Sequence, residues 1–185
     1  MEFIKTQIPD VVLIKPKVFG DNRGYFMESF RDDLFSDHVG KTEFIQDNES
    51  KSSYGVLRGL HYQLPPYCQA KLVRIITGRV WDVAVDLRRH SPTFGQFAAA
   101  ELSEENKHQL FIPEGFAHGF VVLSEEAIVT YKVDAPYAPQ YERGLRYDDP
   151  ELGIDWQIPH SDMQLSEKDG ALPLLENGDV FEEKI

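Results

Sequence analysis

The chain has 185 residues, of which 42% are hydrophobic, and this length is normal for a single domain with a sizeable core. Its formal net charge of −12 argues against nucleic-acid binding, which needs clustered Lys and Arg side chains to neutralise phosphates. The sequence has no run of 18 apolar residues and no signal-peptide pattern, so we expect a soluble, cytoplasmic protein that binds no membrane.

The single cysteine, Cys68, excludes an intrachain disulfide and a cysteine-rich zinc site, and it fits a reducing compartment. Its sequence neighbours offer no base, so we interpret it as a bystander rather than a nucleophile. Because the sequence has no repeat, low-complexity segment or linker, we expect one domain over residues 1–185, with a short helical segment at about residues 160–185.

Short strands dominate the predicted secondary structure. Runs rich in Val, Ile, Phe and Tyr lie between turn clusters, which predicts strands at residues 11–19, 71–76, 80–87, 116–123 and 128–133. Few helices are expected, at residues 31–39, at residues 103–109 and for a turn or two from Ser166. Many strands at this spacing indicate an all-β sandwich or barrel.

Three polar side chains are predicted to face the interior. Because successive residues of a strand point to opposite faces, Lys71, His118 and Tyr131 each point the same way as the apolar residues of their own strands. A filled core would not accept them, since a buried ammonium or imidazole without partners is costly. A barrel with an open mouth that holds a ligand accounts for all three. Trp81 alternates with apolar residues and is expected to be core.

Residues 55–71, GVLRGLHYQLPPYCQAK, have the spacing of a known β-barrel motif. The cupin superfamily has a first motif of the form G-x5-H-x-H-x3/4-E-x6-G and a second of the form P-x-G-x2-H-x3-N. Here Gly55 precedes His61 by the right spacing, and residues 113–118, PEGFAH, supply the second motif. The frame therefore resembles a cupin of the jelly-roll β-barrel type.

Most metal ligands of this frame are replaced. The second histidine of the motif is Gln63, the glutamate position is near Lys71, and the last position of the second motif is Val122. An ammonium repels a divalent ion, so we infer no catalytic metal. His61 can then act as a base on a carbon acidified by a carbonyl, and Lys71 can stabilise the enolate. Tyr131 could return a proton from the opposite face, which would invert a stereocentre.

Nine segments together resemble one family, the dTDP-4-dehydrorhamnose 3,5-epimerases, which are metal-free cupins of the dTDP-L-rhamnose pathway. The matching segments run from about residue 16 to 169 in the family order: DNRGYFMESF, FIQDNES, GVLRGLHYQLPPYCQAK, VWDVAVDLR, SPTFGQ, FIPEGFAHGF, TYKVDAPYAPQYERGL, DDPELGIDW and LSEKD. The resemblance implies epimerisation at C3 and C5 of dTDP-4-dehydro-6-deoxy-D-glucose, giving dTDP-4-dehydro-L-rhamnose.

The resemblance also implies roles for individual residues. His61 would be the general base, Tyr131 the general acid and Asp169 the carboxylate that orients His61. Lys71 would lie near the C4 oxygen, and His118 beside the sugar. The nucleotide and sugar would be held by Arg23, Phe26, Glu28, Gln46, Asp47, Asn48 and Arg58, with Glu142 and Lys168 at the thymidine end. Family members form homodimers by exchange of N-terminal strands, so part of each site could come from the partner.

Several alternatives stay open. His61 could be a satisfied core histidine, and Asp169 in Ser-Glu-Lys-Asp could cap a helix. Arg23 lies in a turn composition, where a solvated arginine is usual. Arg58 has the opposite strand parity to His61, so either Gly59 marks a bulge that resets the face or Arg58 serves the partner's site.

Rival functions also remain. A mono-epimerase or a 3,4-ketoisomerase would use the same scaffold, histidine and nucleotide pocket. A non-catalytic sugar-nucleotide-binding cupin would have no need of His61, Lys71 and Tyr131 together, and a metal-dependent cupin would need a tightly bound ion.

Overall fold

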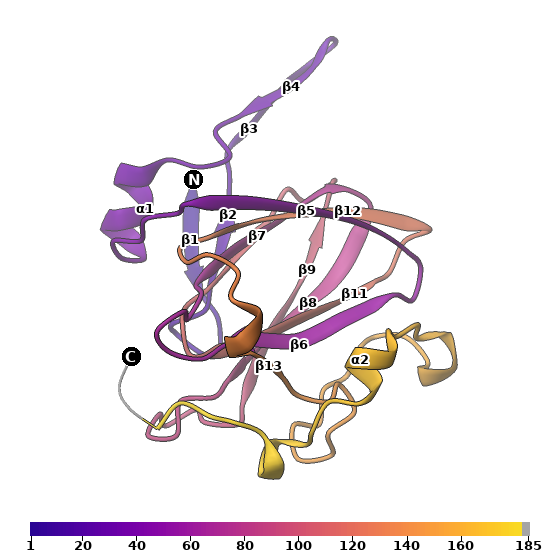
Figure 1. Ribbon diagram of the computed structural model, residues 1–185. Helices are drawn as coiled ribbons and strands as arrows, with labels where there is room; N and C mark the ends of the chain where they lie inside the picture. The colour runs from indigo at the N-terminus through magenta and orange to yellow at the C-terminus, as the bar shows by residue number, and fades with distance from the viewer. Residues whose placement is uncertain (183–185) are drawn as a thin grey trace.

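The computed structural model describes residues 1–182, and two antiparallel sheets packed face to face form its body (Figure 1). One sheet consists, in spatial order, of β1 (Glu2–Lys5), β2 (Val12–Lys15), β10 (Gln109–Ile112), β7 (Lys71–Thr77), β12 (Glu126–Val133) and β5 (Gln46–Ser53). The other consists of β13 (Glu142–Gly144), β6 (Leu57–Gln63), β11 (Phe116–Val122), β8 (Arg79–Asp86) and β9 (Phe97–Ser103). The predicted all-β, cupin-type jelly-roll fold is confirmed.

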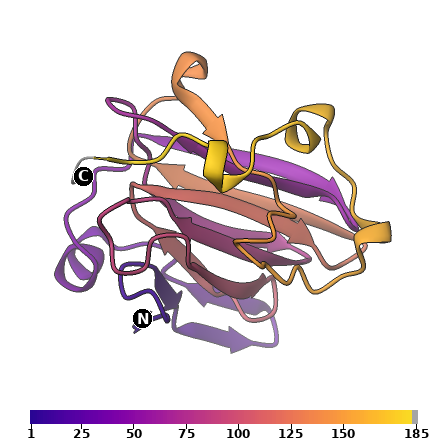
Figure 2. The same cartoon turned by 90° about the horizontal axis from the view of Figure 1, so that it is seen from below.

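The main core lies between the two sheets. Inward-facing residues of both sheets, among them Val73, Ile75, Ala84 and Phe120, are buried there in one cluster. Their alternation with outward-facing residues follows from the two-residue period of a strand. A second cluster packs the chain after residue 144 against the five-stranded sheet, and both views show this segment running along it (Figures 1 and 2).

Most predicted strands are confirmed, but the one predicted at residues 11–19 is divided in two. β2 ends at Lys15 and β3 (Val18–Asp21) begins after Pro16, which has no N–H to donate to a ladder. β3 pairs with β4 (Gly24–Met27) in a hairpin that projects from the body (Figure 1). β5, with the sequence QDNESKSS, was not predicted because it carries no apolar residue.

The helices are short, as predicted. α1 (Asp32–His38) covers part of the six-stranded sheet through Phe35, and α2 (Glu167–Gly170) follows Ser166. The helix predicted at residues 103–109 is wrong. Its segment is a turn in which the Asn106 side chain accepts bonds from the backbone N–H of Ser103 and of His108, a local alternative to helix formation.

The C-terminal segment predicted at about residues 160–185 contains three short helices: η2 (His160–Asp162), α2 and η3 (Leu175–Asn177). Residues 183–185 of that prediction lie outside the described part of the chain. A further 3-10 turn, η1 (Pro139–Tyr141), precedes β13. Among residues 1–182, the longest helices fall well short of the length and apolar character that a membrane crossing requires.

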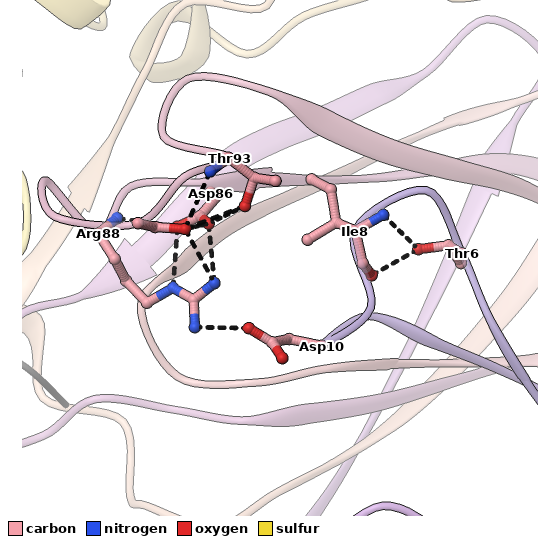
Figure 3. A network of polar contacts seen from close by, with 7 residues as sticks. Thr6, Ile8, Asp10, Asp86, Arg88 and Thr93 are labelled. Atoms are coloured by element: carbon pink, nitrogen blue, oxygen red, sulfur yellow. Dashed lines mark hydrogen bonds and ion pairs between the residues drawn. The ribbon is translucent and has the colours of Figure 1, made fainter.

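A polar network anchors the N-terminal segment beside the end of β8 (Figure 3). The buried carboxylate of Asp86 accepts hydrogen bonds from Arg88, Ser91 and Thr93, at distances between 2.6 and 2.9 Å. The Arg88 guanidinium also pairs with Asp10 at 2.8 Å. Burial alone would raise the pKa of Asp86, but these donors outweigh it, and the pKa is lowered.

Candidate active site

A cavity of about 720 Å³ opens between the two sheets. Its walls are strands of both sheets, and α2 and β13 also contribute. Ten of the residues predicted from the sequence line this one cavity: Gln46, Asn48, Arg58, His61, Lys71, His118, Tyr131, Glu142, Lys168 and Asp169. Their convergence explains why the inward polar groups do not disrupt a filled core.

The side chains of His61 and Asp169 lie at ion-pair distance from each other in this cavity. Nε2 of His61 lies 2.6 Å from Oδ1 of Asp169, and the carboxylate is buried. The Ser166 hydroxyl caps α2 by accepting the Asp169 backbone N–H at 3.0 Å, so the Asp169 side chain is free to face His61. Burial raises the pKa of Asp169, but the hydrogen bond and charge of His61, together with Ser166 and Lys168, outweigh it, and the pKa is lowered.

A bulge in β6 brings Arg58 to the same cavity as His61. His118 pairs with His61 whereas Phe120 pairs with Arg58, so one extra residue of β6 lies within this interval. Gly59 has φ of 141°, and a Cβ there would lie 2.4 Å from the Cα of Gly119. Only glycine fits this position, and the bulge resolves the parity conflict of Arg58 in favour of its own chain's cavity.

Lys71 and His118 line the cavity and are buried, and a fully buried acid, Asp82, lies behind His118. The Lys71 ammonium donates to the backbone carbonyl of His61 at 3.3 Å. Burial lowers the pKa of Lys71 to about 8, and the nearby carboxylates of Asp82 and Glu142 limit the fall. Nε2 of His118 lies 3.0 Å from each Asp82 oxygen. Burial lowers the pKa of His118, while Asp82 opposes that shift.

Tyr131 lies on the six-stranded sheet, opposite the sheet that carries His61 and His118. It pairs with Asn48 on β5 and with Val73 on β7. Burial raises the pKa of its phenol, so the hydroxyl keeps its proton at neutral pH. A ligand bound between the sheets would therefore have an imidazole on one side and a phenol on the other.

Three residues are joined near β13. Glu142 accepts a bond of 2.5 Å from Lys168 and one of 2.7 Å from the Tyr137 hydroxyl. Burial raises the pKa of Glu142, but these donors outweigh it, so the pKa is lowered. A cation, a carboxylate and an aromatic ring in one group can bind a heterocyclic base by hydrogen bonding and stacking.

Four predicted residues do not line the cavity of their own chain. Arg23 and Phe26 lie on the projecting β3–β4 hairpin, with the Arg23 side chain 85% exposed and paired with Asp21, and Glu28 follows β4. Asp47 lies on the outer face of β5 and pairs with Lys132 at 2.9 Å. Its neighbours Gln46 and Asn48 do line the cavity, together with Ser50.

The family model described as dTDP-4-dehydrorhamnose 3,5-epimerase matches residues 5–177. The chain belongs to this family. A curated member from Shigella flexneri is 58% identical over 170 residues, which are 91% of this chain and 93% of that protein.

Solved structures of the family also match. The dTDP-6-deoxy-D-glucose-3,5-epimerase of Legionella pneumophila, in complex with dTDP-4-keto-L-rhamnose, is 47% identical and has a TM-score of 0.95, with coverage of 100% of this chain and 99% of that one. A 3'-monoepimerase of Streptomyces bikiniensis in complex with dTDP-quinovose is 31% identical, with a TM-score of 0.85 and coverage of 95% and 88%.

The residues of the cupin metal positions do not fit a divalent ion in this chain. The Gln63 side chain is committed to the backbone, because it donates to the carbonyls of Tyr67 and Pro136 and accepts from the N–H of Ala138. The ammonium of Lys71 lies in the same cavity and would repel a cation. In residues 1–182, no three His, Cys, Asp or Glu side chains gather in a metal-binding arrangement.

Two groups at the site were missed from the sequence: Tyr137, which lines the cavity, and Asp82, which lies behind His118. Asp82 shares strand parity with Val80 and Ala84, so an acid on the inward face of an apolar strand was a signal that could have been used. Tyr137 lies in an irregular segment between β12 and η1, where no periodic pattern applies. The prediction that Trp81 is core is confirmed in part: it packs against the outer cluster of the five-stranded sheet but is only partly buried.

Proposed function

We propose that this protein epimerises C3 and C5 of dTDP-4-dehydro-6-deoxy-D-glucose to give dTDP-4-dehydro-L-rhamnose, without a cofactor. The observation that carries the proposal is the His61–Asp169 pair on one wall of the cavity with Tyr131 on the other. Both carbons flank the C4 ketone, so one base and one enolate stabiliser can serve both centres. Membership of the family supports this reaction.

The chemical steps use only side chains of the cavity. Neutral His61 takes the proton from the carbon next to C4, and Asp169 stabilises the imidazolium that forms. The electron pair of the broken C–H bond moves onto O4 as an enolate, which the Lys71 ammonium stabilises. The Tyr131 phenol then gives its proton to C5 from the opposite face. The phenolate takes up a proton from solvent and the His61 imidazolium releases one to it, so both groups return to their starting states. The stereocentre is inverted, and no redox change occurs.

Binding of the nucleotide uses the remaining cavity residues. Arg58 would hold the diphosphate, because a guanidinium matches phosphate oxygens, and its Nε already donates to Ser52 at 3.0 Å. Gln46, Asn48 and His118 would contact the nucleotide and sugar. The Glu142 and Lys168 pair, with Tyr137, would hold the thymine.

We propose a homodimer in which each β3–β4 hairpin completes the site of the partner. The hairpin projects from the body and carries exposed Phe19, Tyr25 and Phe26, an apolar surface that a monomer would leave in water (Figure 1). Arg23 at its tip would then reach the partner's bound diphosphate, with Phe26 and Glu28 contributing to the same contact. Asp47, which faces away from its own cavity, is assigned no contact with substrate. A reducing, cytoplasmic location fits a chain whose one cysteine is Cys68.

The test is incubation with dTDP-4-dehydro-6-deoxy-D-glucose in D2O, with deuterium read by mass spectrometry and NMR and His61→Ala as the control. Deuterium at both C3 and C5 that disappears in the control is the expected result. Absence of label at both carbons would contradict the proposal and favour a binding protein.

A mono-epimerase is the second candidate, because a 3'-monoepimerase is among the matching structures. It would add deuterium at one of the two carbons only, so the same experiment separates the two reactions.

A further inference from the structure

Asp82 is a buried acid that the reaction steps do not use. It lies in the middle of β8, its side chain is fully buried, and both of its oxygens lie 3.0 Å from Nε2 of His118. No other hydrogen-bond partner of its carboxylate is found among residues 1–182. A carboxylate buried in this way is costly unless it is paired, and its one partner, His118, lines the cavity.

We propose that Asp82 is a positioning residue of this active site, which fixes the ring of His118 and keeps the ammonium of Lys71 charged in its buried position. The proposal rests on the proposed function, because it assigns Lys71 to the enolate oxygen. Asp82 itself touches neither the substrate nor the reacting atoms in this assignment and acts only through its two neighbours.

The first part follows from the geometry of the His118 ring. A neutral imidazole has one N–H, and both Asp82 oxygens accept at Nε2, so the proton is held at Nε2. Nδ1 is then an acceptor, suited to a sugar hydroxyl. His118 is also the cross-strand partner of His61, so a fixed His118 ring limits the positions open to the base beside it.

The second part follows from the charges around Lys71. Two acids, Asp82 on β8 and Glu142 on β13, act on its ammonium. The other titratable groups that line the cavity are Arg58, His61, Tyr62, His118, Tyr131, Tyr137, Lys168 and Asp169. Glu142 is already bonded to Lys168 and Tyr137. The Lys71 ammonium donates to the backbone carbonyl of His61 at 3.3 Å, and His118, the cross-strand partner of His61, lies 3.0 Å from Asp82. Burial opposes the charge on Lys71, and the two carboxylates preserve it.

The test is the pH profile of kcat for Asp82→Asn, with Asp86→Asn as the matched control. Asp86 is equally buried, on the same strand and with the same parity, but it pairs with Arg88 away from the cavity. On the alkaline limb of this profile, kcat falls as Lys71 loses its proton. For Asp82→Asn we expect this fall to begin at a lower pH than in the wild type, so that the ratio of kcat at pH 7 to kcat at pH 9 changes by about fivefold or more. The control is expected to lower thermal stability and leave the alkaline limb unchanged.

NMR supplies readouts that do not depend on turnover. The ¹⁵N shifts of His118 are expected to report an Nε2-protonated ring that is lost in Asp82→Asn, and the ¹³Cε signal of Lys71 is expected to titrate at lower pH in that variant. An unchanged alkaline limb with unchanged Lys71 titration would overturn the proposal. If the wild type adds no deuterium to substrate but both NMR changes occur, the proposed function fails while the role of Asp82 in this charge arrangement stands.

If Asp82→Asn does not fold, a second variant still tests the proposal. If the defect is a buried ammonium that has lost its carboxylate, Lys71→Met combined with Asp82→Asn restores folding. Failure of the double variant to fold would show that Asp82 has a purely structural role and would overturn the proposal.

Discussion

Nε2 of His61 lies 2.6 Å from Oδ1 of Asp169, although the two residues are 108 positions apart in the chain. β6 supplies the imidazole, and the short helix α2 supplies the carboxylate through a cap at Ser166. A buried carboxylate in this position holds the imidazole ring in one orientation. The pair therefore joins the C-terminal segment to the wall of the cavity.

Replacement of Asp169 by Asn is expected to lower kcat by about 10²-fold, because the imidazolium loses its counter-charge while the shape of the site is kept. KM is expected to change little, since Asp169 is not assigned a contact with substrate. The measurement is steady-state conversion followed by NMR. Glu167→Gln, on the same helix but exposed, is the control, and an equal loss in both variants would contradict a specific role for Asp169.

Tyr131→Phe separates proton removal from proton return. The base is intact in this variant, so deuterium exchange from D2O without inversion at C5 is expected, with net epimerisation reduced by about 10²-fold or more. The measurement is the ratio of exchange to inversion at C5. Tyr147→Phe, on the outer face of the five-stranded sheet, serves as the control. Normal inversion by Tyr131→Phe would rule out the phenol as the acid.

Lys71 gives the protein a pH-dependent stability. Its pKa is about 8 in the folded chain against an ordinary value of 10.5, so between these values the unfolded chain binds more protons. The free energy of unfolding therefore rises with pH in this window. Relative to Lys71→Met, the wild type should gain roughly 2 kcal/mol between pH 7 and pH 10 in denaturant titrations. Lys51→Met, which removes an exposed lysine, is the control and should show the same change in the free energy of unfolding with pH as the wild type. The prediction is contradicted if Lys71→Met also shows the same change as the wild type.

Exchange of the hairpin can be tested with mixed dimers. If Arg23 serves the partner's site, a mixed dimer of His61→Ala and Arg23→Ala protomers has one site with both residues intact. Random 1:1 mixing of the two inactive proteins by co-expression should then restore about one quarter of wild-type activity, since half of the dimers are mixed and each has one intact site. A mixture of His61→Ala and Lys71→Met should stay inactive, because both residues serve their own chain. Equal behaviour of the two mixtures would contradict hairpin exchange.

Arg88→Met is expected to destabilise the fold and leave the chemistry intact. It removes the guanidinium from the buried Asp86 carboxylate, which keeps the hydroxyls of Ser91 and Thr93 and the backbone N–H of residue 88, and it detaches Asp10 (Figure 3). The expected loss is about 1 to 3 kcal/mol in the free energy of unfolding, read from urea titrations. The control is Arg89→Met, at a neighbouring and more exposed arginine. An equally small loss of stability in both variants would show that the Asp86 network does not stabilise the fold.

The sequence by itself determined the fold class and the inward direction of Lys71, His118 and Tyr131, because the two-residue period of a strand is a local property that survives without knowledge of its neighbours. It did not determine which face Arg58 takes, since the bulge at Gly59 depends on the close approach of Gly119 on another strand. Nor did it pair Asp82 with His118. Only the tertiary structure decided these relationships, because they depend on the register between strands that are distant in sequence, and register is fixed by packing rather than by the local pattern.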